Sequence, residues 1–129
     1  MQITLANLAE ATPQQVFNQV SAHLLKQNKQ SKTILNGKGN PGCAYRGDGG
    51  VMCAAGCLIA DSEYDKSMDT TSPSSGTAWH SLIARGIVPT TQHDDMIGRL
   101  QSLHDIQQPH YWRSALAGLA ADYNLVFKA

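Results

Sequence analysis

A run of small and apolar residues in the middle of the chain, residues 52–59 (MCAAGCLI), constrains the fold more than any other feature. A segment without a charged side chain belongs in the interior of a folded protein. Ala54, Ala55 and Gly56 allow neighbouring elements to approach closely, and larger residues there would overpack the core. The segment therefore predicts a central element against which longer helices pack. Its composition leaves open whether that element is a helix or a strand.

Helical periodicity flanks this segment on both sides. Thr12, Pro13 and Gln15 have the spacing of a capping box with proline at the first helical position, and apolar residues follow at helical spacing. We therefore predict a helix over about residues 13–28. The C-terminal half predicts three more helices, over residues 78–85, from Thr91 to Leu103 and from Trp112 to Tyr123.

A turn signal lies between the first helix and the small-residue segment. Residues 43–46 have an extended pattern, and Gly47-Asp48-Gly49-Gly50 supplies residues that tolerate positive φ. Residues 51–53 can return as a second strand. The sequence thus predicts one globular domain over residues 1–129, mainly α (α+β). It would be a compact bundle of four to five helices with a small β-hairpin near residues 43–53.

Composition narrows the class of protein. Hydrophobic residues make up 42% of the 129 residues and charged residues 16%, which suits a folded chain and not a disordered one. Lys plus Arg equal Asp plus Glu at 10 each, so the formal net charge is zero and nucleic acid is not the expected partner. We find no apolar window of transmembrane length and no signal-peptide pattern. We expect a cytoplasmic protein without membrane contact.

All three cysteines, Cys43, Cys53 and Cys57, lie in one short stretch. An odd number of cysteines in a reducing compartment disfavours a disulfide framework. A metal site of Cys43, Cys53 and Cys57 with one histidine is conceivable, but neither interval is a C-x2-C knuckle. Packing of small thiols in the central element is the interpretation we favour, and we expect no cofactor.

A catalytic thiol is the alternative. Cys53 follows a glycine-rich turn, where the start of a helix would lower its thiol pKa, and Cys57 lies one helical turn further on. His104 or His80 would then be the base. Neighbouring residues on a helix point in different directions, so we do not expect His104 and Asp105 to form a dyad by themselves. Whether the chain is an enzyme stays open.

Binding residues are expected around the turn. Tyr45 and Arg46 would present a ring and a cation beside it, with Asp48 at its tip. Lys38 lies in the preceding glycine-rich loop, and together with Arg46 it suggests a small-ligand or nucleotide-binding protein as a further alternative. The Ser-, Thr- and Asp-rich loop over residues 66–77 is a second candidate surface.

The same residues resemble a group of short, uncharacterised phage and bacterial proteins. The shared patterns are C-x-Y-R-G, at Cys43, Tyr45, Arg46 and Gly47, and C-A-x-G-C-L-I-x-D, from Cys53 to Asp61. A looser match follows at His104, Asp105, Trp112 and Tyr123. The resemblance implies a phage or mobile-element context and brings no activity with it. Our leading hypothesis is a small interaction protein that binds and modulates a host protein.

Overall fold

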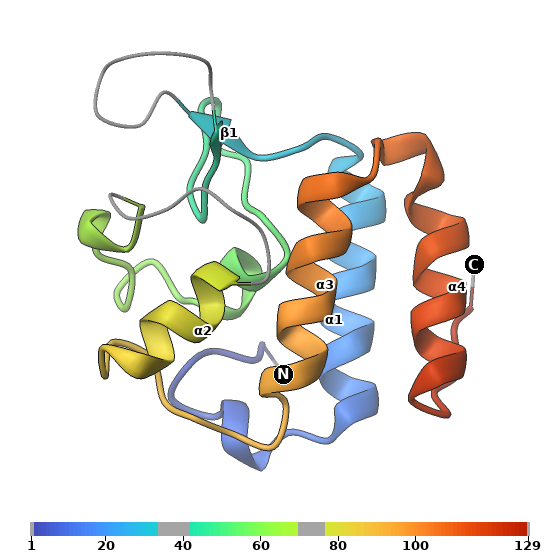
Figure 1. Ribbon diagram of the computed structural model, residues 1–129, viewed down its shortest axis with the longest axis horizontal. Coiled ribbons are helices and arrows are strands. Elements are labelled where there is room, and N and C mark those ends of the chain that lie inside the picture. The colour runs from blue at the N-terminus through green and yellow to red at the C-terminus, as the bar shows by residue number, and fades with distance from the viewer. Residues whose placement is uncertain (1, 34–41, 70–76, 129) are drawn as a thin grey trace.

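The computed structural model describes residues 2–33, 42–69 and 77–128, and it is mainly helical, as the sequence predicts. Within these ranges no helix is both long enough and apolar enough to cross a lipid bilayer. Figure 1 shows α3 in the centre, with α2 on one side, α4 on the other and α1 behind. The α-helices of the described ranges are α1 (Pro13–Gln27), α2 (Thr77–Ala84), α3 (Asp94–Ile106) and α4 (Trp112–Asp122).

The first helix begins where its capping residues predict. The Thr12 side chain accepts a hydrogen bond from the Gln15 amide, and the Gln15 side chain accepts one from the Thr12 amide. Pro13 occupies the first turn, where no amide donor is needed. Asn28 ends the helix in the left-handed region with φ of 49°. The buried face of α1 consists of Val16, Phe17, Val20, Ser21 and Leu24.

The small-residue segment is the central element that its composition predicts. Ala55–Leu58 forms a short 3-10 helix, η3, which contacts both α1 and α3. Its residues are buried, and Ala54 just before them is fully buried. The helix-or-strand question thus resolves to a short 3-10 helix, and a Cβ at position 56 would lie 2.4 Å from the Tyr45 carbonyl oxygen, so this helix lies close against its neighbour.

The predicted hairpin near residues 43–53 is reduced to one bridge. Two residues of strand β1 (Lys32–Thr33) pair antiparallel with β2 (Gly42–Cys43), so Cys43 pairs backward with Lys32. The turn itself is present, with positive φ at Gly49 and Gly50, but only Arg46 and Met52 bridge across it. The backbone groups of Met52 point away from Arg46, and a side chain from α1, that of Gln27, pairs with both of them on this outer side.

Glutamine side chains on α1 pair with extended segments in the way a neighbouring strand would. In each pair the side-chain oxygen accepts from a backbone amide, and the side-chain nitrogen donates to the carbonyl of the same residue. All six N···O distances lie between 2.8 and 2.9 Å. A buried backbone group needs such a partner wherever regular structure supplies none. The pairs are Gln14 with Val126, Gln19 with Ile3 and Gln27 with Met52.

We predict that Gln27→Ala lowers the free energy of unfolding by about 1–3 kcal/mol, because both backbone groups of Met52 lose a partly buried partner. Gln14→Ala is the matched control. It removes the same two-point contact from Val126 on the exposed surface, where water replaces it, and should cost less than about 1 kcal/mol. Urea unfolding of both variants measures the difference, and equal losses would contradict the assignment.

Candidate functional site

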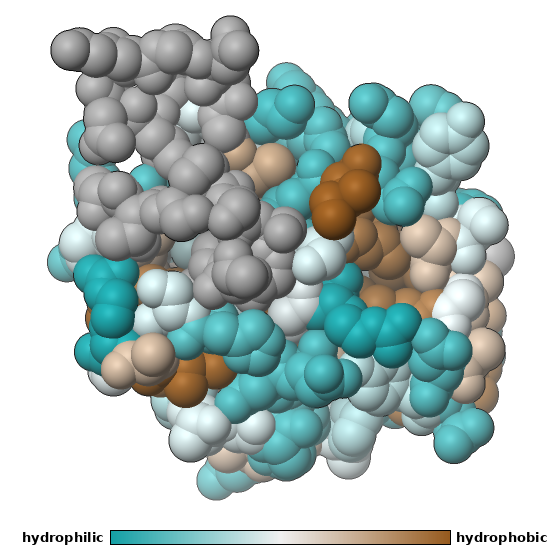
Figure 2. Space-filling view, viewed as in Figure 1, coloured by the Kyte–Doolittle hydropathy of each residue, from teal (hydrophilic) through white to brown (hydrophobic). Residues whose placement is uncertain are grey.

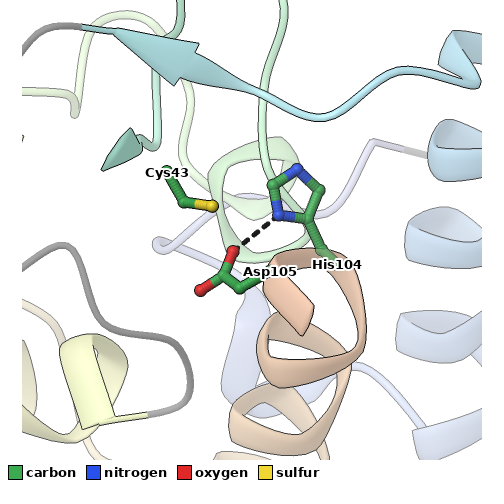
Figure 3. A group of neighbouring side chains, drawn as sticks. All are labelled: Cys43, His104 and Asp105. Carbon is green, nitrogen blue, oxygen red and sulfur yellow. Dashed lines mark hydrogen bonds and ion pairs between the residues drawn. The ribbon is translucent and has the colours of Figure 1, made fainter. Parts of the chain in front are cut away.

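Three side chains of catalytic type meet beside the short strands. The ligand atoms of Cys43, His104 and Asp105 all lie within 4.8 Å of one another (Figure 3). Cys43 comes from β2, whereas His104 and Asp105 come from the last turn of α3. From the sequence Cys43 is a candidate metal ligand beside Cys53 and Cys57, and His104 is a candidate base. Asp105 is not among the predicted ligands, and only folding brings these three residues, which are far apart in the chain, together. We call these three residues the Cys-His-Asp cluster.

His104 and Asp105 contact each other directly, so the expectation that they would not form a pair is wrong. His104 Nδ1 donates to Asp105 Oδ1 at 2.6 Å, and Gln101, one turn earlier, donates to the same oxygen at 2.9 Å. At the end of the helix the Asp105 side chain is free to turn back toward its neighbour, and Gln101 holds it there. The rule that adjacent helical residues diverge fails at this last turn.

The other nitrogen of His104 is also occupied. The backbone amide of Ser31 donates to His104 Nε2 at 2.9 Å, and the His104 side chain is fully buried and stacked on Trp112. Because an amide can only donate, Nε2 must carry the lone pair and Nδ1 the proton. His104 therefore has no free nitrogen to act as a general base. A metal ion on Nδ1 would require a proton on Nε2, which the Ser31 amide opposes.

Burial keeps the thiols protonated. It raises the pKa of Cys43 to about 12, with further contributions from the charge of Asp105 and a hydrogen bond to it. Burial likewise raises the pKa of Cys57 to about 12 and that of Cys53 well above its ordinary value. A nucleophilic cysteine needs the opposite, a thiol whose pKa is lowered toward neutrality. In the folded chain burial thus favours the protonated form of all three thiols, which is not the nucleophilic form.

Cys53 and Cys57 lie in the core, as the packing interpretation predicts. The Cys53 sulfur accepts from the Gly56 amide at 3.2 Å, and the Cys57 thiol donates to the Ala54 carbonyl at 3.1 Å. Within the described residues neither joins Cys43 in a metal-ligand cluster. His80, the other candidate base, is exposed on α2, where its ring lies over Gly98.

Tyr45 and Arg46, which the sequence predicts as binding residues, are largely buried in the structure. Tyr45 is 4% exposed, and the Arg46 side chain retains only 19% of its exposure. The Arg46 guanidinium donates to the carbonyls of Gly56 at 2.8 Å and Ile59 at 2.6 Å, and to Asp61 at 3.2 Å. These carbonyls lie in η3 and at its C-terminal end, where a cation is favourable. We call this set of hydrogen bonds the Arg46 contacts.

The remaining predicted residues have simpler environments. Asp48 is exposed and accepts from the Thr33 hydroxyl at 2.9 Å. Lys66–Asp69, at the start of the predicted loop, forms a short 3-10 helix. Lys38 and residues 70–76 lie outside the described residues, so the predictions made for them remain predictions.

The patterns that carry the phage-protein resemblance serve the fold. A Cβ at position 56 would lie 2.4 Å from the Tyr45 carbonyl oxygen, and one at position 47 would lie 2.6 Å from the Ser31 hydroxyl. Both glycines are therefore required by close packing. Asp69 accepts from the amides of Tyr45 and Arg46 and so holds the first pattern from its other side. Residues of the two patterns hydrogen-bond and pack against each other, so few of their polar groups remain for binding a ligand.

A hollow between α3 and α4 is the surface feature that sequence reasoning missed. It has a volume of about 440 Å³, and Figure 2 shows hydrophobic residues gathered in it. Ile106, 69% exposed, stands at one end, and an ion pair of 2.7 Å between Arg99 and Asp122 closes the other. We call this surface the α3–α4 face. It comprises Arg99, Ser102, Leu103 and Ile106 on α3 and Ala115, Gly118, Leu119 and Asp122 on α4.

Comparison with known proteins adds no assignment. No family model, no curated protein and no solved structure matches the chain.

We predict that Arg46→Lys lowers the free energy of unfolding by about 1–3 kcal/mol, since an ammonium cannot reach both carbonyls that the guanidinium fork holds. Arg113→Lys, on an exposed position of α4, is the control and should stay within about 0.5 kcal/mol of the parent chain. Thermal and urea unfolding measure both. A neutral Arg46→Lys variant would show that the Arg46 contacts contribute little.

Alkylation tests the state of the thiols. With a pKa of about 12, Cys43 in the folded chain should react with iodoacetamide slowly at neutral pH, and its rate should rise about tenfold per pH unit until the pH approaches this pKa. Cys53 and Cys57 should react only after unfolding, because both are buried. Mass spectrometry of the alkylated peptides gives the three rates. A plateau in the Cys43 rate near pH 8 would contradict the protonated state and reopen the catalytic interpretation.

Proposed function

We propose that this chain is a non-catalytic protein-binding module that docks a partner protein through the α3–α4 face. The observation that carries the proposal is Ile106, which remains 69% exposed beside an apolar hollow between two helices. A large aliphatic side chain in water next to such a hollow is typical of an interaction surface.

Both helices present the same kind of stripe to this face. On α3 the lining residues are spaced i, i+3, i+4 and i+7, and the same spacing recurs on α4. Such stripes are the docking faces of helices that pack against further helices. The partner is therefore expected to present helices as well. A host protein, as hypothesised from the sequence, is one such partner.

The alternatives find less support in the polar interior. In the Cys-His-Asp cluster His104 uses both ring nitrogens, Asp105 accepts from His104 and Gln101, and Cys43 is held protonated. Within this cluster neither a free histidine nitrogen nor a thiolate is therefore offered to a substrate at neutral pH. Arg46, the cation expected to bind a small ligand, is engaged by backbone carbonyls instead.

Site-specific photo-crosslinking tests the proposal. A photo-crosslinking amino acid at position 106 should yield adducts with another polypeptide. One at the exposed position 66, in the 3-10 helix Lys66–Asp69 away from α4 (Figure 1), should not. Gly118→Gln in the same chain should abolish the adducts from position 106, because the longer side chain fills the hollow. Adducts that are equal at both positions, or that survive Gly118→Gln, would count against the α3–α4 face.

A further inference from the structure

We infer that a groove along α1, which we call the α1 groove, binds a small organic acid that carries one carboxylate and a hydroxyl group. The groove has a volume of about 660 Å³, which is in the range of small-molecule sites. None of the described residues that line it belongs to the α3–α4 face, so the inference goes beyond the proposed function and does not depend on it. It is carried by the hydrogen-bonding groups in the groove that the fold leaves unpaired.

Two parts of the chain form the α1 groove. Side chains from one face of α1, between residues 15 and 26, form one side, and Ile3, Met52 and Cys57 form the other. Gln19 joins the two sides. Its Nε2 donates to the carbonyls of Ile3 at 2.9 Å and Cys57 at 3.0 Å, and its Oε1 accepts from the Ile3 amide at 2.8 Å. These hydrogen bonds hold both sides of the groove in place before a ligand arrives.

Lys26 gives the groove a positive charge. Among the described residues that line the groove it is the only one with a charged side chain at neutral pH, so no carboxylate of these residues opposes an anion there. Lys26 is exposed, and it forms no hydrogen bond or ion pair with the described part of the chain. A single ammonium balances a single negative charge, which favours a carboxylate over the nearly doubly charged phosphate of a monoester.

His23 supplies a hydrogen-bond acceptor one turn before Lys26. Its Nε2 lies 2.9 Å from the Met52 carbonyl oxygen, which can only accept, so Nε2 carries the proton. Burial lowers the pKa of His23, so the ring is neutral at pH 7 and Nδ1 keeps its lone pair. This nitrogen has no partner within the described ranges and is left for a ligand hydroxyl. Because residues three apart on a helix are neighbours, one molecule can donate to His23 and pair with Lys26.

Two amide side chains nearer the start of α1 add donors without acceptors. The Thr12 amide occupies Oε1 of Gln15, and the Gln14 side chain occupies Oδ1 of Asn18. No described residue engages Nε2 of Gln15 or Nδ2 of Asn18, so both side chains present N–H groups to the groove. An organic acid is rich in acceptor oxygens and therefore matches a surface of this kind.

A small residue leaves space between these polar groups. Ala22 lies one helical turn after Asn18 and one turn before Lys26 on the same face of α1. From Asn18 to Lys26 the helix rises about 12 Å, which sets the length available to a ligand. Ile3 and Met52 border the groove with apolar surface, which suits a short hydrocarbon chain. The expected ligand is therefore a 2-hydroxy acid with an aliphatic chain of a few carbon atoms.

Titration calorimetry of the full chain with 2-hydroxyhexanoate tests the inference. We expect saturable binding of one molecule per chain, with a change in the NMR shifts of the His23 ring nitrogens. Hexanoate lacks the hydroxyl and should bind about threefold more weakly or worse, and 1,2-hexanediol lacks the charge and should not bind at the same concentrations. Absence of saturable 2-hydroxyhexanoate binding at about 10 mM, or equal binding of all three compounds, would overturn the inference.

Removal of the positive charge tests the position of the carboxylate. Lys26→Gln should weaken the binding of 2-hydroxyhexanoate about fivefold or more, because a charge-assisted hydrogen bond is lost. Lys29→Gln is the matched control. It removes the same charge from an exposed position that does not line the groove, and it should leave the dissociation constant unchanged. Equal losses in the two variants would show a general attraction of anions and overturn the assignment of Lys26.

A second pair of variants blocks the groove without removing any of its polar groups. In Ala22→Glu the new carboxylate lies one turn before Lys26, an arrangement that stabilises a helix, so the fold should remain intact. The carboxylate pairs with Lys26 and repels the ligand, and binding should fall below detection. Ala22→Gln adds a side chain of the same size without charge and should retain more of the affinity. Binding that survives Ala22→Glu would overturn the inference, whereas crosslinks from position 106 test the proposed function separately.

Discussion

The rest of the structure depends on the guanidinium of Arg46. It joins the carbonyls of Gly56 and Ile59, and so fixes η3, which contacts both α1 and α3. The short η3 helix is too small to hold its own place by internal hydrogen bonds. A charged donor with a rigid fork can satisfy two of its carbonyls at once, which a lysine cannot. The apolar helices thus pack around η3, whose conformation the Arg46 guanidinium stabilises.

The same principle extends through the irregular middle of the chain. Residues between α1 and α2 form few ladder hydrogen bonds, and side chains supply the partners that buried backbone needs. Gln27 pairs with both backbone groups of Met52, Gln101 accepts from the Ala55 amide, and Asp69 accepts from the Tyr45 amide. His104 likewise accepts from the Ser31 amide. This shared role explains why residue types that suggest catalysis here perform structural work.

The sequence predicts the helices well and the polar interior poorly. Helix signals act between residues close together in the chain, whereas the contacts of the interior join residues far apart in it. Capping boxes and apolar periodicity act over one to four residues, so the start of α1 at Pro13 and the stripe of α4 can be derived from local patterns. The predicted hairpin is present only as the Arg46–Met52 bridge, and the outward backbone groups of Met52 pair with Gln27, a residue distant in sequence. The proximity of Cys43 to His104, and the burial of Tyr45, likewise depend on tertiary packing that no local pattern encodes.

Two glycines show how structural and functional requirements separate in this chain. Gly56 cannot be replaced without a collision, because the Tyr45 carbonyl lies where its Cβ would be. Gly118 has open space on the same test, yet it weakens the helix in which it lies. A glycine that destabilises its helix and is required by no contact inside the chain indicates a contact with another molecule. The cysteine motif thus contributes to the fold, and the α3–α4 face is the surface through which we propose that the chain binds a partner.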